Sequence, residues 1–354
     1  MSKAKTRRAA VEEIEADGRS GEAVRNGPTA NNRSDRLRTR AAWMYFVEQM
    51  TQNEIADVLG VGRVSVVRML SEARARNEVK ISIEGELAEI TRLERALEKR
   101  FALERAIVAP LTATDADPIP VIGAATGHYV SEVMASGMSV GVGWGRTLSA
   151  TLPYIRPRVL TDFKVISLLG GVGVARRFNP AEFAWRYAQL FQGDGYLIPA
   201  PAVVDSPETK KALIERCGLS EIFAMADTLD AVLVSVGGIA SATIPYRGGY
   251  LSETEREALA SKGAVGDLLF HFYDHRGRLI DHPINELVMS VDVDRLRRAR
   301  MRILTSGGRE KIEALLGAMQ LVEPTVFITD EESAKEILRL TEPVQAAPLS
   351  AKAR

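Results

Sequence analysis

The chain has 354 residues, of which 46% are hydrophobic and 26% charged, a composition typical of globular proteins. Its 46 Lys and Arg residues balance its 46 Asp and Glu residues, which excludes a global cationic field as the basis of nucleic-acid binding. The single Cys217 excludes an internal disulfide and a CxxC zinc cluster. Apolar runs stay well short of the roughly 18 residues of a membrane span, and the N-terminus has no hydrophobic signal core. We therefore expect a cytoplasmic protein of two or more domains that does not interact with membranes.

Residues 1–34 mix charged residues with Ala, Gly and Asn and contain few large apolar residues. Such a segment buries too little surface to offset the entropy lost on ordering, so we expect a disordered arm. Across residues 35–82 the apolar residues recur at spacings of three and four, which predicts a helical domain. Residues 83–103 carry a narrow apolar stripe made of Leu87, Ile90, Leu93 and Leu97. This stripe fits a linker helix that pairs with a second chain, and equally a helix that packs on its own body.

The segment MTQNEIADVLGVGRVSVVRML at residues 50–70 has the pattern of two helices joined by a sharp turn. Thr51 can cap the first helix, and Glu54 can return the hydrogen bond. Gly60 can adopt the left-handed backbone conformation that the turn requires. The faces that we expect to be buried carry Ile55, Ala56, Leu59, Val61, Val66 and Met69. The spacing therefore predicts a helix-turn-helix.

The second helix of this pair then presents Arg63, Ser65, Val67 and Arg68 outward. A helix-turn-helix inserts the start of its second helix into the major groove, where Arg can bond guanine and Val can touch a thymine methyl. Ser65 can reach a base edge or a phosphate, and Gln52 can contact a phosphate. A plain helical hairpin in a core is the alternative, but the turn, the burial pattern and the outward arginines together favour DNA binding. One such unit rarely suffices, so we expect a dimer or higher oligomer on repeated half-sites.

Between residues 104 and 342, short β-branched runs alternate with helical segments, and residues 343–354 read as a flexible tail. The alternation predicts an α/β fold, a mostly parallel doubly wound sheet. Four of the expected strands end in glycine-rich turns: VGVGWGRT (140–147), LLGGVG (168–173), SVGG (235–238) and TSGGREK (305–311). In a parallel sheet these ends lie along one crevice, where ligands bind.

Two cations in these turns point to the charge of the ligand. Arg146 and Lys311 each fall in the first turn of an expected helix, where the helix dipole disfavours a cation. An anionic ligand would relieve both, and Thr147 adds a hydroxyl beside Arg146. Pairing with a nearby carboxylate such as Glu310 is the alternative. We favour a phosphate-binding site, because backbone amides at a helix start attract anions.

Catalytic and metal-binding patterns are weaker, and no catalytic residue, metal site or cofactor is assigned. His271 and His275 have a four-residue spacing on a strand and turn rather than on a helix, which makes a poor metal pair. Asp230 and Asp267 could act as general bases in a sugar-phosphate isomerase, and carboxylates that bind sugar hydroxyls are equally consistent. The missing GxGxxG spacing disfavours a nicotinamide-dependent dehydrogenase.

Taken in order, these motifs resemble the SorC-type, sugar-binding bacterial transcriptional regulators over residues 36–340. The carrying stretches are MTQNEIADVLGVGRVSVVRML, VGVGWGRTL, LLGGVG, DAVLVSVGGI, LSETEREALASKGAVGDLLFHFYDHRG, GGREKIEAL and VFITDEESAKEIL. The resemblance implies a helix-turn-helix, a dimerising linker and an effector domain similar in fold to ribose-phosphate isomerases and CoA-transferase-like proteins. It implies a homodimer or homotetramer that binds operator DNA and senses a small phosphorylated sugar or polyol. A sugar-phosphate isomerase or deaminase with a fused regulatory domain is the alternative.

By position, the resemblance also assigns effector contacts. These are the loop residues Gly143, Gly145, Arg146 and Thr147, the pocket-lining Gly170 and Gly171, and Arg247, Asp267 and Lys311. In this assignment Asp267 faces sugar hydroxyls and Lys311 binds phosphate. Leu169 stands where some relatives have Lys or Arg before the double glycine, which implies a singly phosphorylated or smaller ligand.

Overall fold

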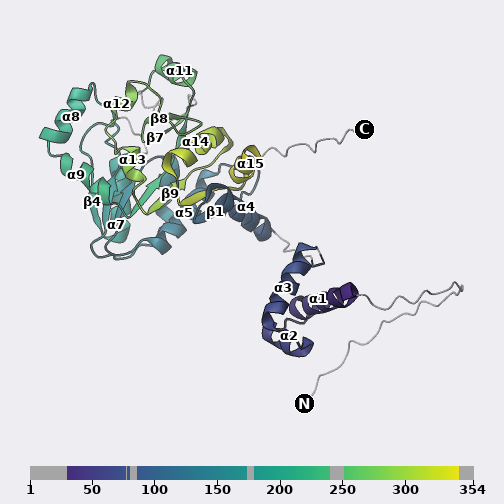
Figure 1. The fold of residues 1–354 in the computed structure, drawn as a ribbon. Helices are drawn as coiled ribbons and strands as arrows, with labels where there is room; N and C mark the ends of the chain where they lie inside the picture. Colours follow the sequence, from purple (N-terminus) through teal and green to yellow (C-terminus); the bar gives the residue numbers. More distant parts are fainter. Residues whose placement is uncertain (1–29, 77, 80–85, 174–178, 240–250, 343–354) are drawn as a thin grey trace, which may run out of the picture. The chain divides into compact units, whose positions relative to one another are not determined.

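The computed structural model divides the chain into two compact units, residues 1–83 and residues 84–354. It describes residues 30–76, 78–79, 86–173, 179–239 and 251–342 (Figure 1). The tail predicted over residues 343–354 and most of the predicted arm lie outside the described residues. The last part of that arm differs from expectation, because helix α1 already begins at Ala30.

The first unit contains three helices: α1 (Ala30–Phe46), α2 (Gln52–Leu59) and α3 (Arg63–Ala75). Its core is small and is formed by Ala41, Ala42, Met44, Ile55, Ala56, Val66, Leu70 and Ala73. Outside this core, the buried Arg38 ties α1 to the segment after α3. Its guanidinium donates from Nε to both oxygens of Glu78, at 3.1 and 2.9 Å. These hydrogen bonds hold the pKa of the Glu78 carboxyl below its usual range.

The turn between α2 and α3 is built as predicted. Thr51 caps α2 and Glu54 completes the reciprocal capping box. Gly60 has φ 64° and ψ 36°, the left-handed conformation that lets the chain reverse after one residue. Gly62 precedes α3 without a side-chain cap, so only the backbone carbonyl of Gly62 meets the first amides of the helix.

The second unit is organised around a seven-stranded sheet in which every strand pair is parallel, in the order β1-β10-β9-β5-β2-β3-β4. The strands are β1 (Arg105–Ala109), β2 (Ser139–Val142), β3 (Lys164–Ser167), β4 (Asp194–Tyr196), β5 (Ala231–Val234), β9 (Met301–Thr305) and β10 (Val326–Asp330). From β2 the chain builds one half of the sheet with β3 and β4. It then returns to the other side of β2 with β5. The predicted doubly wound sheet is confirmed, with its switch point between β2 and β5.

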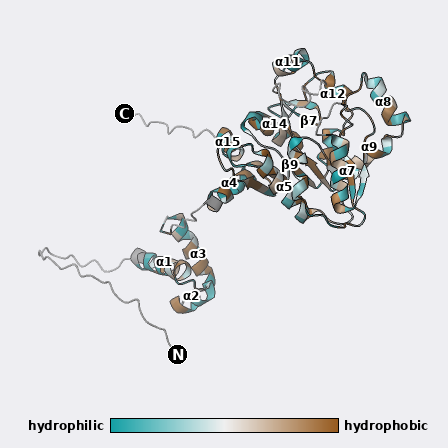
Figure 2. Ribbon diagram, turned by 180° about the vertical axis from the view of Figure 1, so that it is seen from behind, coloured by the Kyte–Doolittle hydropathy of each residue, from teal (hydrophilic) through white to brown (hydrophobic). Residues whose placement is uncertain are grey.

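Both faces of this sheet are covered by helices, because its strands alternate between two cores. Ala231 and Leu233 of β5 face α5 (Ile119–Val133) and α7 (Pro180–Phe191). Val232 and Val234 face the core that includes α4 (Glu86–Phe101), α14 (Ile312–Val322) and α15 (Glu331–Thr341). Figure 2 shows the strands mostly in the hydrophobic colour and the helices in both colours. Among the described residues, no helix has the length and apolar character that a membrane span requires.

A smaller antiparallel sheet lies beyond β5. It consists of β6 (Gly237–Gly238), β7 (Ala264–Leu268) and β8 (His271–Asp274). A turn at residues 274–277 follows β8, where the Gly277 amide donates to the Asp274 carbonyl at 2.9 Å. The remaining elements are α6 (Arg146–Ser149), η1 (Leu152–Tyr154), α8 (Pro207–Arg216), α9 (Ser220–Met225), η2 (Ala226–Thr228), α11 (Glu253–Ser261), α12 (Ile284–Leu287), α13 (Val293–Leu296) and η3 (Arg309–Lys311).

Helix α4 closes the β1 edge of the large sheet. Glu98 accepts a hydrogen bond from the backbone amide of Ala106, and Glu94 accepts one from Val108, both at 3.1 Å. Two acidic residues one helical turn apart therefore satisfy two alternate amides of an edge strand that would otherwise be free to pair with another chain. Of the apolar stripe predicted on this helix, Ile90, Leu93 and Leu97 pack against the chain's own core.

We expect Glu94→Ala to lower the free energy of unfolding of the second unit by about 1–3 kcal/mol, because it leaves a buried amide without a partner. Glu89→Ala on the same helix is the matched control. It removes only a 3.7 Å ion pair with Lys335 and should change stability by less than about 0.5 kcal/mol. Chemical denaturation measures both, and equal effects for the two variants would show that Glu94 does not protect the sheet edge.

Candidate functional site

The outward face of α3 is open to solvent. Arg63, Val67 and Arg68 are exposed, whereas Ser65 is half-buried. Val64 is 83% exposed, more than any other large apolar side chain in the described part of the chain. It is not among the outward residues predicted from the sequence. A valine open to solvent at the start of such a helix is suited to contact a thymine methyl.

Beside this face lies a hollow of about 660 Å³ at the N-terminal ends of α2 and α3. It is lined by Tyr45, Gln49, Met50, Thr51, Gln52, Asn53 and Arg63. Inside it the Arg63 Nε donates to the Gln52 Oε1 at 3.4 Å. Two side chains that were predicted separately as DNA contacts thus meet, and Gln52 can orient the guanidinium of Arg63.

In the second unit, the four glycine-rich turns follow β2, β3, β5 and β9. These strands are consecutive in the middle of the sheet, in the order β9-β5-β2-β3. Because the sheet is parallel, the four turns come out at its carboxyl edge, next to the switch point where ligands bind in such folds. The strand order confirms the prediction that these four strand ends lie together.

The turn after β2 carries a cation and a hydroxyl that have no partner in the part of the chain that the structure describes. Gly145 has φ 115° and nothing within 4 Å of where a Cβ would stand, so the backbone here demands glycine and borders open space. Arg146 follows and is exposed, with no hydrogen bond or ion pair among the described residues. Thr147 is only 3% exposed, and its hydroxyl likewise lacks a partner in the described part of the chain. Gly143 is buried and donates its amide to the Leu233 carbonyl at 2.8 Å.

The turn after β9 places Lys311 immediately before α14, as predicted. Its ammonium donates to the Ser306 hydroxyl at a long 3.5 Å. The alternative that Lys311 is paired with a carboxylate is not seen among the described residues, since no ion pair within 4.0 Å involves it. Lys311 is half-buried, and this burial lowers the pKa of its ammonium.

Asp267 lies on β7, opposite Gly237 of the turn after β5. A Cβ at Gly237 would collide with the Asp267 Oδ1, so this glycine makes room for the carboxylate. The Asp267 Oδ2 accepts a hydrogen bond from the Phe270 amide at 3.2 Å. The carboxyl is 6% exposed, and burial raises its pKa to about 6, although the Phe270 hydrogen bond and Lys311 oppose the shift.

Charged groups at the carboxyl ends of the strands also influence the pKa of Lys311. The pKa of Lys311 is lowered further by Arg146, and it is raised by Glu310, Asp267 and Asp117. Residues from the turns after β1, β2 and β9 and from β7 therefore all influence the pKa of Lys311. Two cations and one buried carboxylate can hold an anion on one side and hydroxyl groups on the other.

Other predicted site residues have structural roles or lie elsewhere. A Cβ at Gly170 would stand 2.6 Å from the Ala200 carbonyl oxygen, and the Gly171 amide donates to that same carbonyl. Close packing against Ala200 is enough to require glycine at position 170, so a ligand contact is not needed to explain this residue. Leu169, the departure from the family pattern, is 1% exposed. Arg247 lies outside the described residues.

The two candidate general bases are not brought together. Asp230 precedes β5 at the opposite edge of the sheet, where it accepts a hydrogen bond from the Ser139 amide at 2.8 Å. His271 is buried and its Nε2 lies 2.7 Å from the Ser290 hydroxyl, whereas His275 is exposed in the following turn. Among the described residues no cluster of His, Cys, Asp or Glu could hold a metal ion.

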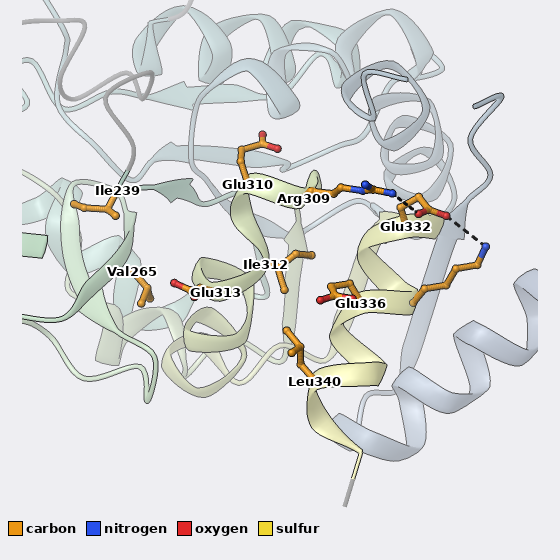
Figure 3. Close-up of a pocket in the computed structure, with 10 residues that line it drawn as sticks. Ile239, Val265, Arg309, Glu310, Ile312, Glu313, Glu332, Glu336 and Leu340 are labelled. Atoms are coloured by element: carbon orange, nitrogen blue, oxygen red, sulfur yellow. Dashed lines mark hydrogen bonds and ion pairs between the residues drawn. The ribbon is translucent and has the colours of Figure 1, made fainter. Parts of the chain in front are cut away.

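The turn after β9 that carries Lys311 (residues 306–311) is called the Lys311 turn. A groove of about 780 Å³ lies beside it (Figure 3). Among the described residues, none of the predicted effector contacts lines this groove. Ile239, Val265, Ile312 and Leu340 supply its apolar lining. Its rim is charged and contains Arg309, Glu310, Glu313, Glu332, Lys335 and Glu336. The cations on this rim are already paired with the acids of α15.

The model of the Sugar-bind family, a sugar-binding domain, matches residues 86–339. The chain is 29% identical over 307 residues to the erythritol catabolism regulatory protein EryD of Brucella abortus, covering 86% of this chain and 96% of the relative. It is 28% identical over 304 residues to the deoxyribonucleoside regulator of Bacillus subtilis, covering 85% and 97%. The crystal structure of the full-length sorbitol operon regulator SorC from Klebsiella pneumoniae has a TM-score of 0.68 and 26% identity, covering 86% of this chain and 99% of that chain.

The raised pKa of Asp267 predicts the sign of a stability change. The folded state binds this proton more tightly than the unfolded chain, whose pKa is near 3.8. Stability is therefore lost as the pH rises through about 6, by up to about 3 kcal/mol. We expect Asp267→Asn to be more stable than wild type at about pH 8, with the difference vanishing near pH 4, in chemical denaturation. Asp230→Asn at the other edge should show no such gain, and a wild type more stable than Asp267→Asn at both pH values would contradict the assignment.

Proposed function

The chain belongs to the Sugar-bind family, and on this premise we propose that it is a transcriptional regulator that binds operator DNA through α3 and a sugar or polyol effector at the carboxyl edge of its sheet. The family match covers most of the second unit, and the similarity to named regulators extends over most of the chain. The printed names of these relatives refer to erythritol, deoxyribonucleosides and sorbitol. We therefore infer a regulator of carbohydrate or polyol metabolism.

One observation carries the effector site: Arg146 follows β2 and Lys311 follows β9, the two strands that flank β5, and Asp267 lies opposite Gly237 in the turn after β5. Arg146, with no partner among the described residues, and the half-buried Lys311 are suited to a phosphate, which charge-assisted hydrogen bonds from both would bind strongly. The buried carboxylate of Asp267 is suited to accept hydrogen bonds from sugar hydroxyls. The preferred ligand in this proposal is a singly phosphorylated sugar or polyol, since the turn after β3 presents Leu169 rather than a cation.

In this proposal the second unit senses its ligand and does not convert it. The two carboxylates named as candidate general bases are separated, because Asp230 precedes β5 whereas Asp267 lies opposite Gly237 after it. Regulation requires that the effector bind two states of the protein with different affinity. A dimer or tetramer would place two α3 helices on repeated half-sites, so a change in their spacing would change operator affinity.

We expect Arg63→Ala to weaken binding of operator DNA by about 1–3 kcal/mol, because a guanidinium at the start of α3 is lost from the groove. Arg76→Ala is the matched control, since Arg76 follows the end of the same helix. Fluorescence anisotropy with DNA that the protein has selected from a random pool measures both, and circular dichroism verifies the fold. A wild-type affinity for Arg63→Ala would remove this residue from the DNA contact.

We expect Lys311→Ala to bind a phosphorylated polyol at least about tenfold more weakly, while DNA binding is retained. A thermal-shift screen of erythritol, sorbitol and their phosphates finds the ligand, and calorimetry compares the variants. Stabilisation by the free polyols but not by the phosphates would contradict the phosphate assignment. Turnover of a sugar phosphate that is lost in Asp267→Asn would instead support an enzyme.

A further inference from the structure

The Lys311 turn is fastened to the first turn of α15. The Gly308 amide donates to the Asp330 Oδ2 at 3.0 Å and also lies 2.8 Å from the Ser333 hydroxyl. Asp330 is the N-cap of α15, and both Asp330 and Ser333 are essentially inaccessible to solvent. A Cβ at Gly307 would collide with the Asp330 carboxylate. The turn therefore cannot shift without breaking buried hydrogen bonds or moving the start of α15.

A second link joins the same two elements at the surface. Arg309, two residues before Lys311, forms an ion pair with Glu332 at 3.0 Å. Glu332 also lies 3.4 Å from Lys335 on the next turn of α15. Figure 3 shows Arg309 and Glu332 joined at the edge of the groove. The Arg309–Glu332 ion pair therefore adds a link at the outer face of α15 to the buried hydrogen bonds at its N-cap.

Helix α15 is in turn joined to α4. The Lys335 ammonium lies 3.7 Å from Glu89, which is on α4. Beneath this pair, Ala334 and Ile337 of α15 are buried in the core against which Ile90 and Leu93 pack. Figure 1 shows the two helices side by side, although they come from opposite ends of the second unit. A displacement of α15 therefore reaches α4 through direct contacts.

Helix α4 is the first element of the second unit and follows the DNA-binding unit in the chain. Strand β10 cannot carry the same displacement easily, because it is paired on both sides, with β1 and β9. Helix α15 lies on the surface of the sheet, and ion pairs at its face can rearrange at small cost. The more movable of the two routes from the Lys311 turn to α4 runs through α15.

We propose that α15 is the relay that transmits occupancy of the Lys311 turn to α4, with Asp330 and Glu332 as the residues that position it. The inference rests on the proposed function, because it names how that effector site is regulated. A ligand that draws Lys311 toward its phosphate pulls on Gly308, and Asp330 converts that pull into a movement of the first turn of α15. The contacts of Lys335 and Ile337 then carry the movement to α4.

Hydrogen exchange of the ligand-free full chain tests the relay. Glu332→Gln weakens the link between the turn and α15, and we expect the amides of α4 to exchange about two- to fivefold faster. Glu336→Gln is the matched control on the same helix, because Glu336 pairs with Arg339 within α15. It should leave α4 unchanged. The amides of α7, on the other face of the sheet, provide the internal reference.

Coupling between two sites is reciprocal, so a substitution on α4 must also change the hydrogen exchange of the Lys311 turn. Glu89→Gln should therefore alter the exchange of residues 305–311 while leaving that of α7 unchanged. A merely structural role would instead change all three regions together. Unchanged α4 exchange in Glu332→Gln, or a uniform change that includes α7, would overturn the relay.

The relay and the proposed function fail separately in these experiments. The relay alone is contradicted if the chain binds a sugar phosphate and DNA but the amide exchange of α4 is unchanged in Glu332→Gln. A chain in which α4 responds as expected, but which binds none of the phosphorylated polyols, supports the relay as a property of the fold and contradicts the proposed effector.

Discussion

All seven strands of the large sheet run in the same direction, so every strand delivers the residue after it to one edge. This constraint brings Arg146 and Lys311, which follow the two strands that flank β5, to the same end of the sheet. Asp267 joins them from the smaller antiparallel sheet, where β7 pairs with Gly237 beyond the end of β5. Asp267 and Lys311 are unfavourable without a ligand, because burial disfavours their charges. Asp267 is a buried carboxylate, Lys311 is a half-buried cation at the start of a helix, and Arg146 has no partner among the described residues. An anion with hydroxyl groups would satisfy all three, and its binding would stabilise the fold by mass action.

The helix-turn-helix depends on a different constraint, which is local. The capping box of Thr51 and Glu54 and the left-handed Gly60 fix where α2 begins and where it ends. The small core then leaves the face of α3 with Arg63 and Arg68 in solvent. The first unit therefore owes its geometry to residues close in sequence. The site of the second unit, by contrast, owes its geometry to strand order.

This difference explains how much could be predicted from the sequence. Caps, turns and the alternation of strands and helices are local signals, and they predicted the elements and the parallel sheet. The glycine turns predicted which strand ends meet. They did not predict that β7 pairs beyond the end of β5, which separates Asp267 from Asp230 at the start of that strand. The roles of Glu94, Glu98 and Asp330 were not visible, because each bonds to a backbone group that only the tertiary fold brings near. For the same reason Gly170 reads as a ligand contact in sequence and as a packing requirement in the structure.

In the proposed function, a negatively charged metabolite at the carboxyl end of the sheet and DNA at α3 are linked through one protein. The most direct measurement is the affinity for DNA over a range of effector concentrations, together with the affinity for effector with and without saturating DNA. Linkage requires the two affinities to change by the same factor. We predict that common factor to differ clearly from one. An effector that binds tightly at the carboxyl ends of the strands while the affinity for DNA stays constant would contradict this linkage.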